Sequence, residues 1–378
     1  MRAMRSAPLG LLAALILGCT PREPPAASAP ATPPSASQDS EGRVDASAPV
    51  VVADADAPAP VGAVPKLVPI ADAPKPSFGV AASASAVSWA IYEGGDVLRV
   101  PRPGGAVLPL AHGQDYVNAI AADDREVYWS IGHGVVPGGV IRRWSGGTVS
   151  DFAPAQADAR SVAIDATHVY WIVAGGYDGA GGSATPELRR RARTGGPIDK
   201  LASLADGPTR LVLDGDDVWF IAGGSPPFAA HGIVGRVPKT GGAVTTIASG
   251  LVNPIGLAVD GDFVYWSTVG PMVAPPQPVC PKGVPCPIAT VVPITDKGAV
   301  QRVAKSGGAP TTIVGGLRDA GRVSAHRGVV VFQAGRAVHA VSGAGGTPTK
   351  LADGGMSEIT WVGDVGYAQI GGKIVELR

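Results

Sequence analysis

The sequence predicts an all-β fold: a seven-bladed β-propeller made of four-stranded antiparallel blades, with the last blade closed by an N-terminal strand. Three observations lead to this prediction. The 378 residues include 53 Gly and 36 Pro, the two poorest helix formers, yet 45% of the chain is hydrophobic and needs a core. A hairpin-like block recurs seven times along the chain. A Gly-Gly turn recurs six times, once between each pair of consecutive blocks.

The repeated block consists of two apolar strands joined by a short polar turn. Its clearest copy is residues 257–266, which has Asp260 and Gly261 at the turn. The other copies are residues 80–89, 120–129, 162–171, 211–220, 323–332 and 359–368. Alternating apolar residues on both sides of an Asp-Gly type turn are typical of a β-hairpin, so each block predicts the first two strands of a blade.

A second block adds two more strands joined by a Gly-Gly turn. These turns lie at residues 104–105, 146–147, 195–196, 241–242, 307–308 and 345–346. The last copy has none, because the chain ends in residues 373–378 as a third strand without a fourth. Residues 62–67, ahead of the first block, resemble the fourth strand at residues 346–351. Pairing of the two ends would close the ring and leave no open sheet edge.

The blocks resemble the repeats of the YWTD and NHL classes of propeller. The residues that carry the resemblance are Tyr128-Trp129-Ser130, Tyr170-Trp171 and Tyr265-Trp266-Ser267-Thr268. It covers nearly all of residues 62–378, although no copy has the Asp that completes the YWTD motif. The resemblance implies a propeller and no particular activity, because propellers of this kind serve many functions.

Residues 1–19 have the pattern of an export signal, with Arg2 and Arg5 ahead of an apolar stretch at residues 8–17. The stretch ends in Ile-Leu-Gly-Cys, which resembles the lipobox of bacterial lipoproteins. The resemblance implies that Cys19 is lipidated and that the protein is exported and held in the cell envelope, at the outer membrane. The alternative is an ordinary signal peptide with an incidental Cys.

Residues 20–61 are rich in Pro, Ala and Ser and lack large apolar side chains, so they predict a disordered tether between the membrane and a propeller domain at residues 62–378. Two further cysteines, Cys280 and Cys286, lie in a Pro-rich stretch. In an oxidising compartment they predict one local disulfide. The alternative is a metal site, for which two Cys without a nearby His supply half of the ligands.

The charge balance excludes some classes of partner. Lys and Arg number 31 and so do Asp and Glu, so no basic surface is expected to bind nucleic acid. No motif for a catalytic nucleophile, a phosphate loop or a metal site is present, and we expect no catalytic residue, no bound metal and no cofactor. Clusters such as Asp214-Gly-Asp-Asp217 predict hairpin turns, and the repeated Trp and Tyr predict packing between blades.

The candidate binding residues follow from propeller geometry. The first strand of each blade lines the central channel, so the residues just before each block encircle one mouth of it. They include Arg160, Arg210, Arg322, Glu358 and Asn118. The longest insertions fall between second and third strands and therefore reach the same face. The arginines suit capture of a carboxylate or phosphate; the alternative is that they pair with Glu358 and plug the channel.

The leading functional hypothesis is a lipid-anchored extracytoplasmic propeller that binds a protein, a peptide or an envelope polymer through its long-loop face. An alternative is an enzyme that resembles the lactonase or lyase propellers, with an active site and a divalent cation at the channel mouth. A further alternative is a structural envelope lipoprotein without a specific ligand.

Overall fold

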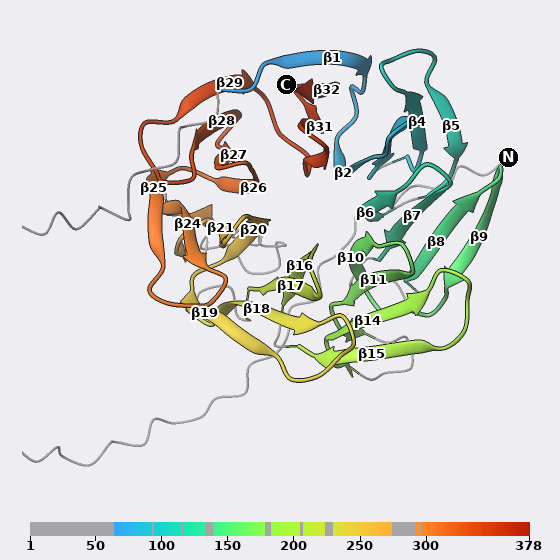
Figure 1. Ribbon diagram of the computed structural model, residues 1–378, viewed down its shortest axis with the longest axis horizontal. Helices are drawn as coiled ribbons and strands as arrows, with labels where there is room; N and C mark the ends of the chain where they lie inside the picture. Colours follow the sequence, from blue (N-terminus) through green and yellow to red (C-terminus); the bar gives the residue numbers. More distant parts are fainter. Residues whose placement is uncertain are drawn as a thin grey trace, which may run out of the picture. The chain divides into compact units, whose positions relative to one another are not determined.

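The computed structural model describes residues 64–92, 94–114, 116–132, 139–177, 183–204, 207–223, 230–273, 292–294 and 296–378. All of them belong to one compact unit, Asp56–Arg378. They form seven four-stranded antiparallel sheets arranged around a central axis (Figure 1). The predicted all-β propeller with seven blades is therefore confirmed. No helix long and apolar enough to cross a membrane occurs in these stretches.

The first four blades follow one another along the chain, each with its innermost strand first. Blade 1 comprises β2 (Ser77–Ala82), β3 (Ala86–Ile91), β4 (Val97–Pro101) and β5 (Leu108–Ala111). Blade 2 comprises β6 (Val117–Ala122), β7 (Glu126–Ile131), β8 (Val140–Ser145) and β9 (Thr148–Ala153). Blade 3 comprises β10 (Ala159–Ile164), β11 (His168–Val173), β14 (Glu187–Ala192) and β15 (Ile198–Ser203). Blade 4 comprises β16 (Pro208–Asp214), β17 (Asp217–Ala222), β18 (Gly232–Pro238) and β19 (Thr245–Leu251).

The remaining blades complete the ring. Blade 5 comprises β20 (Pro254–Asp260), β21 (Phe263–Thr268), β24 (Gly298–Ala304) and β25 (Thr311–Leu317). Blade 6 comprises β26 (Ala320–His326), β27 (Val329–Ala334), β28 (Ala337–Ser342) and β29 (Thr349–Asp353). Blade 7 comprises β30 (Thr360–Val362), β31 (Val365–Ile370), β32 (Lys373–Leu377) and, from the other end of the domain, β1 (Leu67–Asp72).

The ring is closed by β1, which pairs with β32 at the outer edge of blade 7 (Figure 1). The register runs from Leu67 opposite Leu377 to Asp72 opposite Lys373. Closure by an N-terminal strand is thus confirmed, but the strand lies further along the chain than the predicted residues 62–67. Of β1, only Leu67 falls in that range. Lys66 ahead of it exchanges backbone hydrogen bonds with Arg378, and the ladder then continues to Asp72.

The predicted hairpin blocks coincide with the two inner strands of each blade. In six blades the first and last residues of the block are direct cross-strand partners, as Val80 and Trp89 are in blade 1. The hairpin turns follow the predicted chemistry. Gly261 takes a φ of 53°, and the Asp165 carboxylate accepts hydrogen bonds from two amides of its own turn. Both glycines of all six Gly-Gly turns also have positive φ.

The repeated aromatic residues pack between blades, as predicted. The side chains of Trp89, Trp129, Trp171 and Trp266 are fully buried. Trp171 of blade 3 shares one cluster with Tyr128 of blade 2, so each interface between blades is a separate small core. The Ser after Tyr-Trp has its own role, because the Ser267 hydroxyl bonds to a carbonyl of the next blade and accepts a hydrogen bond from an amide of its own blade.

The strand directions separate two faces. Residues at the start of each inner strand pair with the end of the second strand, as Val117 does with Ile131, so the connections between second and third strands leave on the face where the inner strands begin. Two of these connections carry extra hairpins, β12 (Gly176–Tyr177) with β13 (Ser183–Ala184) and β22 (Met272–Val273) with β23 (Val292–Pro293). We call this side the long-loop face and the side with the Asp and Gly-Gly turns the short-turn face.

Candidate functional site

The long-loop face has a cavity of about 450 Å³ at the mouth of the central channel. Phe78, Asn118, Arg160, Arg210, Ile255 and Arg322 are among the residues that line it. All six come from the first residues of inner strands in blades 1 to 6. A second cavity of about 470 Å³ lies below and follows the inner strands, and Arg210 lines both. All three arginines of the predicted binding set therefore line one cavity, and their role in binding stays a prediction.

Glu358 connects two of the arginines. One carboxylate oxygen, Oε1, lies 2.9 Å from Arg210 Nε and 3.1 Å from Arg322 Nη1. The side chains of Arg210 and Arg322 are 19% and 11% exposed, so both guanidinium groups are recessed in the mouth. Glu358 lines the channel below them rather than the mouth cavity itself. The predicted pairing across the channel is present, and it joins blades 4, 6 and 7.

Arg210 and Arg322 share one carboxylate oxygen of Glu358. Burial, and after it the neighbouring Arg210 guanidinium, lower the pKa of Arg322 to about 9, and the Glu358 carboxylate offsets only part of that shift. Arg322 remains positively charged at neutral pH.

Arg160 and Asn118 make separate contacts at the same mouth. Arg160 Nη2 lies 2.7 Å from the carboxylate of Asp158, just ahead of the same strand. The Asn118 side-chain amide donates to the carbonyls of Gly132 and Ala159, at 2.6 and 3.0 Å. Asn118 therefore links blade 2 to blade 3 by hydrogen bonds. Arg160 forms an ion pair with a carboxylate that the other two arginines do not share.

Aromatic and aliphatic side chains lie beside the arginines. The rings of Phe78 and Tyr92 lie 4.6 Å apart, and Tyr116 meets Tyr92 edge-on at 6.0 Å. Phe78 is 40% exposed, and the Arg322 guanidinium lies 5.7 Å from the centre of its ring. Ile255 is 37% exposed on the same cavity. The mouth thus combines recessed positive charge with exposed apolar surface.

Several mouth residues were not singled out from the sequence. Asp158 and Tyr116 precede inner strands, and Tyr92 follows the second strand of blade 1. Asp158 and Tyr116 both take positive φ, at 48° and 64°. Position relative to the repeats could have identified Tyr92, but the side-chain directions depend on loop conformations that the repeat pattern does not encode.

The predicted lipidation site at Cys19 and the predicted disulfide between Cys280 and Cys286 lie outside the described residues, as do residues 1–63. Among the residues that are described, no group of three His, Cys, Asp or Glu side chains is arranged to hold a metal ion. Of the acidic side chains described in this region, Asp158 at the mouth and Glu358 in the channel below it are engaged with arginines. The mouth therefore resembles an anion site more than a cation site.

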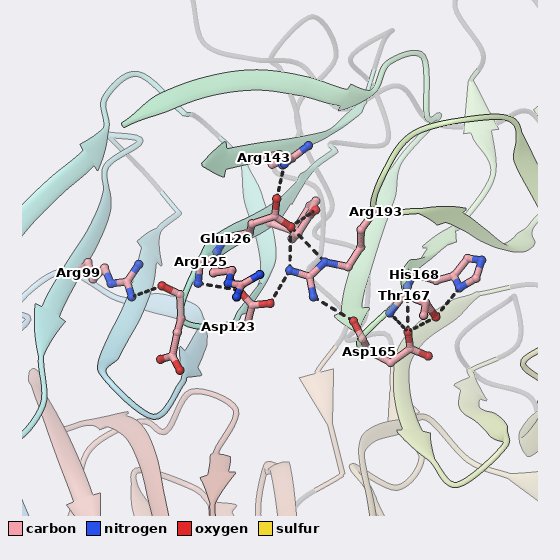
Figure 2. Close-up of polar contacts among 11 residues, drawn as sticks. Arg99, Asp123, Arg125, Glu126, Arg143, Asp165, Thr167, His168 and Arg193 are labelled. Carbon is pink, nitrogen blue, oxygen red and sulfur yellow. Dashed lines mark hydrogen bonds and ion pairs between the residues drawn. The ribbon is translucent and has the colours of Figure 1, made fainter. Parts of the chain in front are cut away.

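A second cluster of charged side chains lies on the short-turn face between blades 2 and 3 (Figure 2). Arg193 bonds to the carboxylates of Asp123 and Glu126, and it donates to the Asp165 carbonyl at 3.1 Å. Arg143 bonds to the other oxygen of Glu126. Each acidic group faces a guanidinium group, so this cluster is neutralised internally and serves to join the two blades.

The comparisons with known proteins show the fold alone. No protein-family model and no curated protein matches the chain. A computationally designed protein has a TM-score of 0.51 and 13% identity, over 83% of this chain and 99% of its own. The tricorn protease has a TM-score of 0.52 and 7% identity, over 82% of this chain and 34% of its own. A structure described as a nidogen/laminin complex has a TM-score of 0.47 and 13% identity, over 68% of this chain and 89% of its own.

Proposed function

We propose that this chain is a lipid-anchored extracytoplasmic propeller that binds a peptide or protein partner at the channel mouth, on the long-loop face. The observation that carries this proposal is the mouth cavity, where the exposed Phe78 and Ile255 lie beside the recessed guanidinium groups of Arg210 and Arg322. Exposed aromatic and aliphatic surface next to arginine is typical of the central contacts in protein interfaces.

The cellular location belongs to the same proposal. The lipobox-like residues 16–19 support lipidation of Cys19 and export to the cell envelope. Incorporation of a labelled fatty acid into the intact protein, but not into the Cys19→Ala variant, is the expected result. Equal labelling of both would contradict it.

Ile255 and Val244 provide a matched pair of positions for testing the binding surface. Their exposed fractions are 37% and 36%, but Ile255 lines the mouth whereas Val244 lies between a Gly-Gly turn and β19 on the short-turn face. We expect Ile255→Asp to abolish recovery of the partner from envelope extracts, because a charge then replaces apolar contact surface. Val244→Asp is the control and should recover the partner as the unaltered protein does. Equal recovery by both variants would contradict the site.

A further inference from the structure

Among the described residues of the mouth, positive side chains outnumber negative ones by one. In this part of the chain Arg160, Arg210 and Arg322 contact two carboxylates, those of Asp158 and Glu358. Arg160 has Asp158 to itself, whereas Arg210 and Arg322 both contact the same oxygen of Glu358. The uncompensated charge is therefore located between Arg210 and Arg322. A single negative charge from outside would balance it.

The recessed position of the Arg210 and Arg322 guanidinium groups favours a small anion at the end of a chain over one in the middle of a chain. Both guanidinium groups are recessed, and the channel continues beneath them between the inner strands of the blades. An internal segment of a chain would have to enter the recess and turn back out of it to reach the arginines. The end of a chain can reach the arginines and stop there.

The surroundings show where the rest of such a ligand would lie. Phe78 and Ile255 offer apolar surface next to the arginines. A neighbouring cavity of about 540 Å³ shares Phe78 and Arg322 with the mouth cavity and continues to Met356 and the exposed Arg336. The two cavities have room for several residues of an extended peptide.

We propose that the channel mouth binds the C-terminal end of a peptide chain, with the terminal carboxylate on Arg210 and Arg322 and the last side chain against Phe78 and Ile255. This inference rests on the proposed function and adds the chemical group that is recognised. A carboxylate fits the forked donors of arginine, and hydrogen bonds between charged partners are the strong ones. The single charge of a terminal carboxylate also matches the excess of one positive charge among the described side chains of the site.

The test uses paired peptide libraries on the full chain. N-acetylated hexapeptides with three randomised C-terminal positions are made once as free acids and once as C-terminal amides, and binding is measured by fluorescence polarisation at low ionic strength. We expect the selected sequences to bind as free acids about tenfold to a hundredfold more tightly than as amides, with apolar residues preferred at the last position. Equal affinity of the two forms would overturn the proposal.

Two substitutions locate the effect. Arg210→Gln should reduce the preference for the free acid by about tenfold. Arg236→Gln is the control, because Arg236 lies in the same blade but pairs with Asp217 away from the mouth. Glu358→Gln should act in the opposite direction and tighten binding of the acid by about fivefold, since it removes a competing carboxylate while keeping an acceptor oxygen. If the arginines only plugged the channel, Glu358→Gln would bring no gain in affinity.

The outcomes separate this inference from the proposed function. In one outcome, peptides bind equally as acids and amides and lose binding to the Phe78→Ala variant. That outcome would support a peptide-binding site but overturn recognition of the chain end. Selection of internal Asp or Glu in the amide library would assign the arginines to acidic side chains and overturn the proposal. Binding of no peptide from either library would contradict both the inference and a peptide-binding function.

Discussion

Arg193 links blades 2 and 3 through ion pairs. It is 15% exposed and bonds to Asp123 and Glu126 across the blade interface (Figure 2). We expect Arg193→Gln to lower the free energy of unfolding by about 1–3 kcal/mol, because the buried Glu126 then loses a charged partner. Chemical denaturation measures the change. Arg125→Gln is the control on the same turn: its exposed side chain makes no hydrogen bond or ion pair within the described part of the chain, so a similar loss there would contradict the assignment.

Asp165 makes part of the stability depend on pH. Burial opposes its ionisation, but hydrogen bonds from the Thr167 and His168 amides and the Tyr170 hydroxyl outweigh burial, so its pKa lies below the usual 3.8. The ionised form therefore stabilises the fold above about pH 4, and this contribution is lost as the pH falls through the lowered pKa. We expect Asp165→Asn to flatten the acid dependence of unfolding between about pH 4 and pH 2.

The control for this titration is Asp353→Asn. Asp353 is 84% exposed and pairs only with Lys350 in the described residues, so its ion pair contributes little to stability. The acid dependence of this variant should match that of the unaltered protein. An unchanged slope in Asp165→Asn would show that the turn hydrogen bonds do not favour the charged form.

The mouth shows which residue-level features a sequence can predict. Arg160, Arg210 and Arg322 were located because strand alternation fixes which positions precede each repeated block. The sequence leaves the sharing of Glu358 by two of them as one alternative. It could not be decided, because the partner of a long flexible side chain depends on distances across the channel between blades that are far apart in the sequence.

At the level of the strands, one feature recurs at the start of the inner strands. The residue just before the strand takes positive φ in blades 2 to 6, as Asn253 does at 51°. The inner pairing then shifts register within the next residues, as between Pro254 and Leu257. This irregularity turns the first residues of the strand toward the mouth. The repeat pattern predicts the strands well, but it does not reveal a left-handed residue that differs in type from blade to blade.

Gly256 sets how closely the inner strands of blades 5 and 6 approach. A Cβ at this position would lie 2.7 Å from the Val323 backbone nitrogen and 2.9 Å from the Gly321 carbonyl oxygen. Since backbone atoms cannot move aside without separating the blades, we expect Gly256→Ala to lower the free energy of unfolding by about 1–3 kcal/mol. Gly355→Ala is the control, because nothing lies within 4 Å of its added Cβ. Equal thermal stability of the two variants would contradict this role.

At the level of the whole molecule, stability depends on joining the two ends of the domain. Besides the ladder between β1 and β32, the Gln369 side chain donates to the Ala73 and Lys75 carbonyls and accepts from the Ser77 amide. These bonds connect blade 7 to the segment that leads into blade 1. Closure was predictable because a third strand without a fourth and a fourth strand without a blade lie at opposite ends of the repeat pattern.

Removal of β1 tests the closure. We expect deletion of residues 64–72 to lower the unfolding temperature and to cause self-association, because the edge of β32 becomes available for pairing. Deletion of nine residues from the predicted tether, residues 40–48, is the control of equal length and should leave both properties unchanged. Thermal unfolding and size-exclusion chromatography measure them. A monodisperse, equally stable protein without β1 would show that the ring does not need this strand.

Photo-crosslinking in intact cells tests the central claim, that the channel mouth is the binding surface. A photoreactive amino acid is placed at Ile255 on the long-loop face or at Val244 on the short-turn face, two positions of nearly equal exposure. We predict that illumination joins a discrete partner to the Ile255 variant alone, and that Arg210→Gln weakens this product. A product from Val244 alone, or equal products from both positions, would contradict the claim.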